Sequence, residues 1–207
     1  MERLLDVAAD MFLNEGFSQV SINEIVRRAG GSLSTAYGLF GSKEGLLLAV
    51  WQHRFAQIGA EVYRSELFAL PVEQALPRFV RALLDHALAP EALRMFRLVV
   101  AEGASFPRLR EQVFPIVDRR LIQPLESYLR AEAARRRLRL TDPRHAALRI
   151  AHLVRGEAFW CLLRGLEHPV TPAERRRMVA EIVAIFWTVM VAAPSRGRGA
   201  GAPGAVR

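Results

Sequence analysis

The chain has 207 residues, 51% of them hydrophobic, and a formal net charge of +8. Its single cysteine excludes an internal disulfide framework, and its longest apolar run, residues 182–193, is shorter than the roughly 20 residues that cross a bilayer. With no apolar signal segment at the N-terminus, these features predict a cytoplasmic protein that is not embedded in a membrane.

The positive charge is not concentrated in the first 50 residues. That segment holds four basic and six acidic side chains, a net charge of −2, and the excess of arginine lies farther along the chain. Arginine clusters such as 135–137 and 175–177 fall at expected helix ends, where the helix dipole favours a cation or the side chains stay hydrated. Bulk charge therefore does not identify a nucleic-acid surface.

The first 30 residues predict two helices. Apolar positions from Leu4 to Phe12 follow helical spacing, and Gly16 is placed to end that helix in the left-handed conformation. Ser21 and Glu24 form an S-x-x-E pattern, in which the hydroxyl accepts from one free N–H and the carboxylate from another. A second helix is therefore expected from about Ser21 to the glycines at 30 and 31.

A third helix is expected over Leu33–Leu39, with Ser32 as its cap. Ser42 is placed to cap a fourth helix, which begins at Lys43 and continues through Ile58 with apolar residues at helical spacing. The fourth helix is long enough to connect these short helices to the rest of the chain.

The remaining chain predicts further helices separated by prolines. Its apolar residues show no sustained alternation of the kind that strands require, so the predicted fold class is all-α. The helices are placed near residues 72–88, 90–104, 107–137, 143–166 and 172–192. Pro115 and Pro124 are expected to bend or split the third of them.

The second and third helices, joined by a glycine turn, fit a helix-turn-helix, whose second helix enters the major groove of DNA. Ser34 and Thr35 can hydrogen-bond to base edges, and the phenol of Tyr37 can reach a phosphate oxygen. Lys43 begins the next helix, so its ammonium and the free N–H groups there can meet at one phosphate. Phe40 is interpreted as a core residue instead.

Residues 2–51, with the runs AADMFLNEGF, SINEIVRRAG and GSLSTAYGLFGSKEGLL, resemble the DNA-binding domain of the TetR/AcrR family of bacterial one-component regulators. The resemblance implies that Ser21, Tyr37 and Lys43 hold phosphate. It also implies a set of residues that face the DNA. These are Leu33, Ser34, Thr35 and Gly38, and Ser32 at the helix start completes the predicted DNA-binding set.

Two positions depart from the family pattern. Family members usually carry a basic or polar residue at the position of Leu33 and an aromatic residue or His at that of Gly38. Leu33 offers only an apolar contact, and Gly38 lowers helix propensity by about 1 kcal/mol relative to Ala. We therefore expect the affinity to depend on phosphate contacts, with Arg27 or Arg28 added, and to weaken steeply with salt.

The resemblance also implies the organisation of the whole chain. It predicts a helix-turn-helix DNA-binding domain over residues 1–50, a helical effector-binding and dimerisation domain over 51–193, and a flexible tail over 194–207. Family members form homodimers through their last two long helices, here about 143–166 and 172–192. Two recognition helices one DNA turn apart match a palindromic operator. The run RLVVAEGASFPRLREQ resembles the subgroup with an AefR-like C-terminal domain.

By analogy with the family, a pocket between the middle helices is expected to bind a small apolar or amphipathic effector, without a cofactor. A ligand acts there only if it favours one dimer geometry over the other. The candidate lining residues are Phe55, Ile58, Val62, Leu83, Met95, Val99, Trp160 and Cys161. The candidate polar anchors are Arg94, Arg97, Glu102 and Glu157.

Enzymatic and metal-binding functions are not expected. The five histidines show no spacing of the H-E-x-x-H kind. Cys161 lies in an apolar segment, which is typical of an unreactive buried thiol, with a redox-sensing role as the alternative.

The predicted function is a ligand-responsive transcriptional repressor that binds a palindromic operator as a homodimer; activation is the less common mode in this family. Two other classes of protein stay open. A non-specific architectural DNA-binding protein leaves the large apolar C-terminal region without a purpose, and a helical small-molecule enzyme leaves the first fifty residues unexplained.

Overall fold

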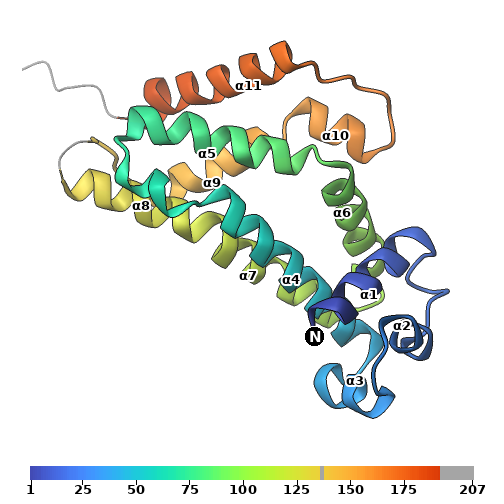
Figure 1. Ribbon diagram of the computed structural model, residues 1–207. Coiled ribbons are helices and arrows are strands. Elements are labelled where there is room, and N and C mark those ends of the chain that lie inside the picture. Colours follow the sequence, from blue (N-terminus) through green and yellow to red (C-terminus); the bar gives the residue numbers. More distant parts are fainter. Residues whose placement is uncertain (136–137, 192–207) are drawn as a thin grey trace, which may run out of the picture.

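The computed structural model describes residues 1–135 and 138–191 (Figure 1). Within these ranges the chain is helical and has no strand, apart from one isolated antiparallel bridge between Leu140 and Val191. The all-α prediction is therefore confirmed. The predicted tail over 194–207 lies outside the described residues, as do the last positions of the predicted second domain and of the helices expected to end at 137 and 192.

Three short helices form the head of the molecule, at the lower right of Figure 1. They are α1 (Glu2–Asn14), α2 (Ile22–Ala29) and α3 (Leu33–Phe40). Each buries its apolar side in a shared cluster, to which α1 contributes Phe12 and α2 contributes Ile25. Burying an aromatic or aliphatic side chain of this size stabilises the fold by about 1.5–3 kcal/mol.

Glycines follow the helices of the head, and Gly16 and Gly30 do so where the sequence predicts. Gly16, Gly30 and Gly41 have φ angles of 90°, 73° and 71°, and glycine adopts this left-handed region without the steric penalty of a Cβ. The turns between α1, α2 and α3 are therefore short, and the three helices pack closely.

Serines begin three of the first four helices. The side-chain oxygens of Ser21, Ser32 and Ser42 each accept a hydrogen bond from the backbone N–H three residues later, at 3.2, 3.4 and 3.1 Å. The predicted helix starts are confirmed, because each hydroxyl satisfies one N–H that the helix itself leaves without a partner.

The capping box predicted at Ser21 is only half formed. The Ser21 hydroxyl accepts from the Glu24 N–H, but the Glu24 carboxylate does not return to Ser21. It binds Arg27 and Arg28 instead, with nitrogen–oxygen distances of 2.6 and 3.1 Å. Two charged partners one turn along the same helix compete successfully with a neutral backbone N–H.

The body of the molecule begins with α4 (Lys43–Val62), which leaves the head and packs beside α7 (Figure 1). The other body elements are η1 (Ser65–Ala69), α5 (Val72–Ala87), α6 (Pro90–Gly103), α7 (Pro107–Val117), α8 (Gln123–Ala134), α9 (Pro143–Val154), α10 (Glu157–Leu163) and α11 (Pro172–Ile185). In the layered body, α5 packs against both α11 and α9, and α8 packs against α9. No helix within the described ranges combines the length and apolar composition that a membrane span requires.

The helix predicted over 107–137 is divided by a π-helical turn, η2 (Asp118–Ile122). This turn lies between Pro115 and Pro124, two residues that offer no N–H to a helical hydrogen bond. The expected split is therefore confirmed. A second π-helical turn, η3 (Phe186–Met190), follows α11.

The single helix predicted over 143–166 was wrong, because the chain breaks at Arg155–Gly156 into α9 and α10. Gly156 is extended, with φ −72° and ψ −160°, and a Cβ there would lie 3.3 Å from the carbonyl oxygen of Leu153. Periodicity does not reveal the break, since one glycine inside an apolar run is only a weak signal. The break places Arg155 at the end of α9, next to the interior of the body.

Aromatic residues fill the far end of the body. Phe79 has no exposed surface, and its ring centroid lies 5.4 Å from those of Tyr63 and Tyr128. The Tyr128 hydroxyl donates to the carbonyl oxygen of Leu70 at 2.8 Å, and burial raises the pKa of the Tyr63 phenol. These contacts join segments 58 residues apart in the sequence, so the core depends on long-range packing.

Side chains from α4 and α6 hold the head against the body. Arg94 of α6 donates to the side-chain oxygen of Asn14 at 2.9 Å, and Arg54 of α4 lies 3.5 Å from the carboxylate of Asp6. The rings of Phe17 and Phe106 meet edge to face, with centroids 5.4 Å apart. These contacts connect α1 and the loop after it to α4 and to the segment around α6.

Candidate DNA-binding surface and ligand cavity

Helix α3 presents most of its surface to solvent. Ser34, Thr35 and Tyr37 are exposed, Tyr37 to 49%, whereas Ala36 is buried against the rest of the head. Ala36 is small enough for α3 to pack closely while the neighbouring hydroxyls point away. The structure thus brings the predicted base-contacting and phosphate-contacting residues of α3 onto one open face.

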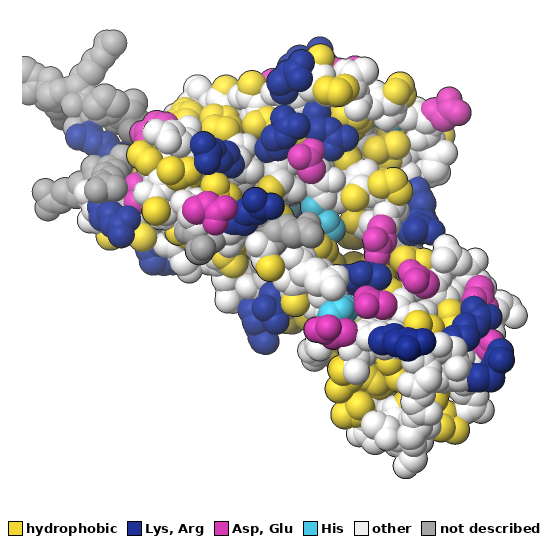
Figure 2. All heavy atoms as spheres, viewed as in Figure 1, with side chains coloured by type: hydrophobic (Ala, Val, Ile, Leu, Met, Phe, Trp, Pro, Cys, Tyr) yellow, Lys and Arg dark blue, Asp and Glu magenta, His cyan; other side chains and the backbone are white. Residues whose placement is uncertain are grey.

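Charged side chains are scarce at this end of the molecule. On the face shown in Figure 2, the lower tip, where α3 lies, shows only apolar and uncharged polar groups. Leu33 is 38% exposed there, and a Cβ at Gly38 would meet no atom within 4 Å, so a partner can approach the backbone of α3 closely. The two departures from the family pattern therefore lie on the open face of α3.

Ser21 and Ser32 are exposed as well as capping their helices. In a cap the hydroxyl oxygen accepts a hydrogen bond, which leaves the O–H free to donate to another group. Capping and a phosphate contact are therefore compatible at both serines. Their roles toward DNA remain predictions.

The ammonium of Lys43 is held by the head itself. Its Nζ donates to the carbonyl oxygens of Phe17 and Val20 at 2.7 and 2.8 Å, approaches that of Ser18 at 3.4 Å, and lies 4.5 Å from the Phe17 ring centroid. An ammonium has three N–H donors, so these carbonyls engage all of them. Lys43 thus ties the start of α4 to the loop between α1 and α2. To bind a phosphate as predicted, Lys43 must give up at least one of these hydrogen bonds to a carbonyl oxygen.

Arg27 and Arg28 also have protein partners. Arg27 pairs with Glu24, and Arg28 pairs with both Glu24 and Glu15. The hydrogen bond from Arg27 is the main reason that the pKa of the Glu24 carboxyl is lowered. A phosphate contact from either arginine would use N–H donors left free beside a carboxylate already in place.

The body contains a partly open cavity of about 360 Å³ lined by α4, α5, α6, α9, α10 and the segment from α7 to α8. Its wall is mainly apolar. The apolar lining residues are Trp51, Phe55, Ile58, Leu83, Ala87, Ala89, Ala92, Met95, Phe96, Val117, Leu121, Ile122, Leu125, Ala147, Ala151, Val154 and Phe159. A cavity of this size and composition is typical of a site for a small organic molecule.

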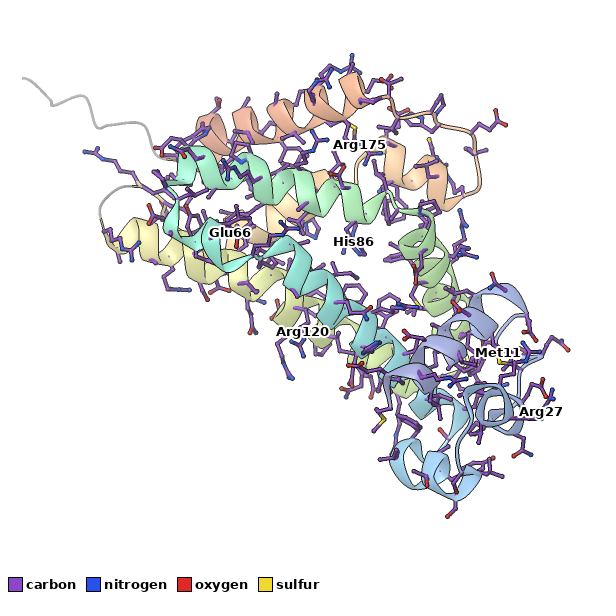
Figure 3. The ribbon with its side chains drawn as sticks, in the orientation of Figure 1. Met11, Arg27, Glu66, His86, Arg120 and Arg175 are labelled. Atoms are coloured by element: carbon purple, nitrogen blue, oxygen red, sulfur yellow. The ribbon has the colours of Figure 1, made fainter. Side chains whose placement is uncertain are left out.

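Five polar residues line the same cavity: Arg54, Gln57, His86, Glu91 and Arg155. Figure 3 shows His86 projecting from α5 toward α4, and its ring meets that of Phe55 edge to face. Burial, together with the nearby Arg155 charge, lowers the pKa of His86 from 6.5 to about 4. The imidazole is therefore neutral at pH 7, and burial also lowers the pKa of the Arg155 guanidinium.

Four of the eight predicted ligand-binding residues line this cavity: Phe55, Ile58, Leu83 and Met95. The other four lie elsewhere. Val62 and Val99 belong to the packed core, Trp160 is 49% exposed on α10, and Cys161 lies beside it in contact with Arg164. The break at Gly156 explains the last two positions, because it turns α10 so that Ala158 and Phe159 face inward.

The polar residues predicted as anchors do not line the cavity either. Arg94 binds Asn14, Arg97 binds the carbonyl oxygens of Leu162 and Leu163, and Glu157 is exposed. Sequence reasoning missed His86 and Arg155. A histidine near the end of an amphipathic helix and an arginine before a glycine are usually surface residues, so neither gives a local sign of facing a cavity.

Comparison with known proteins decides the family. Residues 74–189 match the family model described as AefR-like transcriptional repressor, C-terminal domain, and residues 4–50 match the model described as bacterial regulatory proteins, tetR family. The first match alone spans more than half of the chain. The protein belongs to the TetR family. The predicted resemblance of residues 2–51 to the TetR/AcrR DNA-binding domain is therefore confirmed, as is that of the run RLVVAEGASFPRLREQ to the AefR-like C-terminal domain.

This TetR-family protein is similar to one curated relative in sequence and to several solved structures in fold. The HTH-type transcriptional regulator SrpR of Pseudomonas putida is 23% identical over 129 residues, a match that covers 62% of this chain and 59%, less than two thirds, of SrpR. A Mesorhizobium loti structure assigned to the TetR family gives a TM-score of 0.76 at 22% identity and covers 90% of this chain and 94% of the other. The flavonoid-responsive regulator FrrA gives a TM-score of 0.74 at 26% identity, covering 89% and 93%.

TetR-family proteins are DNA-binding transcriptional regulators and not enzymes, which confirms the non-enzymatic prediction. Among the residues that the structure describes, no group of three or more His, Cys, Asp and Glu side chains could hold a metal ion. Within the described residues, the open face of α3 and the cavity in the body are candidate sites for recognising another molecule.

Proposed function

We propose that this TetR-family regulator is a ligand-responsive repressor, which acts in the cytoplasm as a homodimer on a palindromic operator. The observation that supports the proposal most strongly is the open face of α3. There Ser34, Thr35 and Tyr37 are exposed together, while Ala36 fixes the helix in the head.

This face can recognise DNA by hydrogen bonds more than by charge. The hydroxyls of Ser34 and Thr35 can pair with base edges, and the Thr35 methyl can contact the methyl group of thymine. The Tyr37 phenol and the O–H groups of Ser21 and Ser32 can donate to phosphates. Because α3 has no charged residue, discrimination between operators would rest on these few contacts and on the shape of the DNA.

The last helix supports a homodimer. Ile185 at the end of α11 and Val189 in η3, about one helical turn apart, are 37% and 60% exposed. Large apolar side chains that share an open face are typical of an interface between subunits. A two-fold axis through this face would pair identical surfaces and set two copies of α3 against a symmetric operator.

The cavity supports a response to a ligand. Arg54 lines the cavity and lies within ion-pairing distance of both Asp6 of α1 and Glu91 of α6, at 3.5 and 3.2 Å. A ligand that displaces α4 or α6 would therefore shift α1 and the head. FrrA, a relative of similar fold, is described as flavonoid-responsive.

Fluorescence anisotropy with the labelled DNA upstream of the protein's own gene tests DNA recognition. We expect tight binding that an unlabelled specific duplex reverses and an unrelated duplex does not. Thr35→Ala should weaken binding about tenfold, as expected for one lost base contact of about 1–3 kcal/mol. Thr141→Ala, an exposed threonine of the body, is the matched control and should leave the affinity unchanged. Equal binding to all duplexes, or equal effects of both variants, would overturn the proposal.

A second measurement addresses the dimer. Light scattering of the purified chain should give twice the monomer mass, and Val189→Glu should shift it toward the monomer, because a buried unpaired carboxylate is costly at an interface. A monomeric wild type would contradict the palindromic mode of binding.

Repression is tested by a reporter gene placed under the control of the upstream DNA. Expression of the reporter should rise when the gene of the regulator is deleted.

A further inference from the structure

Arg155 is an arginine without a partner beside the cavity. Among the described residues no carboxylate or carbonyl accepts a hydrogen bond from its guanidinium, although the side chain is partly buried. Other arginines of this region are engaged: Arg97 binds the carbonyl oxygen of Leu163 at 2.6 Å, and Arg54 lies near two carboxylates. A partly buried cation without an anion of the protein favours the binding of an anion from another molecule.

The surroundings of Arg155 leave its charge uncompensated. Its neighbour His86 is neutral, and of the residues lining the cavity only Glu91 carries a carboxylate. That carboxylate lies 3.2 Å from Arg54 on another part of the wall. The described wall therefore offers one unpaired guanidinium to whatever enters the cavity.

Arg155 also faces a second, smaller cavity. This cavity has a volume of about 160 Å³ and shares Phe96, Val117, Ile122, Ala151 and Arg155 with the main one. The guanidinium thus stands where the two spaces adjoin. Exposed Phe114 and His152 line the smaller cavity, so it leads from Arg155 toward the surface.

The rest of the main cavity favours an aromatic or otherwise apolar body. Trp51 and Phe55 have ring centroids 4.7 Å apart on α4, and Phe96 of α6 and Phe159 of α10 have centroids 5.5 Å apart. Aromatic walls bind flat rings by stacking and edge contacts. Trp51 is only 2% exposed, so its ring is held within the wall by the surrounding packing.

We infer that the effector is an organic anion: a carboxylate held by Arg155 and joined to an aromatic or apolar body that fills the space between α4 and α6. A guanidinium binds a carboxylate through two parallel hydrogen bonds, which gives both strength and orientation. The inference rests on the proposed role of the cavity as the effector site and specifies the chemical class that the site selects.

Isothermal titration with two probes of equal shape tests the inference. At pH 7, 2-naphthoate is an anion and 2-naphthamide is neutral, and both contain the same bicyclic ring. We expect the wild type to bind 2-naphthoate at least about tenfold more tightly than 2-naphthamide, because only the anion pairs with the guanidinium. The Arg155→Gln variant should bind both probes with similar affinity, close to that of the wild type for the amide.

Two further variants make the test specific. Arg149→Gln removes an exposed arginine from the same helix and should keep the full preference for the anion. Arg155→Lys keeps the charge but loses the paired hydrogen bonds, so it should keep only part of the preference. Binding of 2-naphthamide to each variant also shows that its cavity is folded.

Equal affinity of the wild type for both probes, a preference that survives Arg155→Gln, or failure of both probes to bind would each overturn the inference. None of these outcomes bears on the anisotropy experiment, which measures operator binding without a ligand. Conversely, the protein could prefer the anion through Arg155 and yet fail to bind its upstream DNA. That result would support the inferred ligand class and contradict the proposed repressor function.

Discussion

In the head, α2, α3 and α4 each start at a serine whose hydroxyl caps the helix. Glycines with positive φ follow the ends of α1, α2 and α3. In the body, α6, α7 and α8 start with proline at their first turn, and two π-helical turns interrupt the helical path. Both regions bury apolar side chains, but local serine caps and glycines mark the helix ends of the head, whereas prolines and π-helical turns shape the path of the body. The head therefore presents an exposed face of α3 that the sequence predicts, whereas the packing of the body leaves a cavity.

The largest expected effect tests the dependence of the body on packing. Phe79→Ala removes a fully buried ring that contacts three other aromatic rings. It should lower the free energy of unfolding by about 3–5 kcal/mol, because the lost apolar contact leaves a cavity behind. Urea denaturation measures the change. Phe114→Ala, at a site 61% exposed, is the control and should change stability by less than about 0.5 kcal/mol. Similar losses in both variants would contradict the comparison.

The second prediction concerns pH. His86 has a pKa of about 4 in the folded protein against 6.5 ordinarily, because burial and the Arg155 charge disfavour protonation. Between these values the unfolded chain binds a proton that the folded chain does not, so stability should fall as pH drops from 6.5 to 4 and be unaffected by this group above 6.5. The loss is on the order of 2–3 kcal/mol.

The pH effect is checked by measuring unfolding at several pH values in the wild type and in two variants. His86→Gln should flatten the profile over this window. His145→Gln, at an exposed position of α9, should keep the wild-type slope. A profile that keeps its slope without His86 would show that the loss of stability has another source.

A third prediction separates two roles of Lys43. Since its ammonium bonds to carbonyl oxygens of the loop between α1 and α2, Lys43→Gln should destabilise the free protein by about 1–2 kcal/mol as well as weaken DNA binding. Tyr37→Ala, at an exposed residue of α3, should weaken DNA binding without changing the melting temperature. If Lys43→Gln lowers DNA affinity alone, the tie to the loop contributes nothing to stability.

The smallest expected effect tests the local hydrogen bonds of the head. Ser32→Ala removes the cap of α3 and should lower stability by about 1 kcal/mol. Ser34→Ala, two residues later on the exposed face, removes no cap and should alter stability by a few tenths of a kcal/mol at most. Thermal denaturation followed by circular dichroism compares the two. A larger loss from Ser34→Ala would contradict the assignment of the cap.

Much of the head could be predicted from the sequence, because its signals are local. Ser32 lies three residues from the N–H that it caps, and Gly41 ends α3 for a reason internal to its own backbone. The family resemblance in residues 2–51 points to the same surface. What local signals could not show is the environment of Lys43, whose partners lie 23 to 26 residues away along the chain.

In the body the sequence predicted most of the helices, but only four of the eight residues predicted to bind a ligand line the cavity. Phe55 and Met95 were accessible to prediction, since a buried aromatic or methionine on an inward face is expected near any internal space. His86 and Arg155 were not, because polar residues usually face solvent and only the packing of α5 against α9 and the break at Gly156 turn them inward.

The sequence by itself therefore determined the all-α class, the capped helices of the head, the exposed hydroxyls of α3 and the family. Each of these follows from residues close together in the chain or from their order. The tertiary structure alone decided that Lys43 is bound by its own loop and that an unpaired Arg155 faces a cavity beside a neutral His86. These depend on the distances between segments far apart in the sequence, and such distances are fixed only when the core packs.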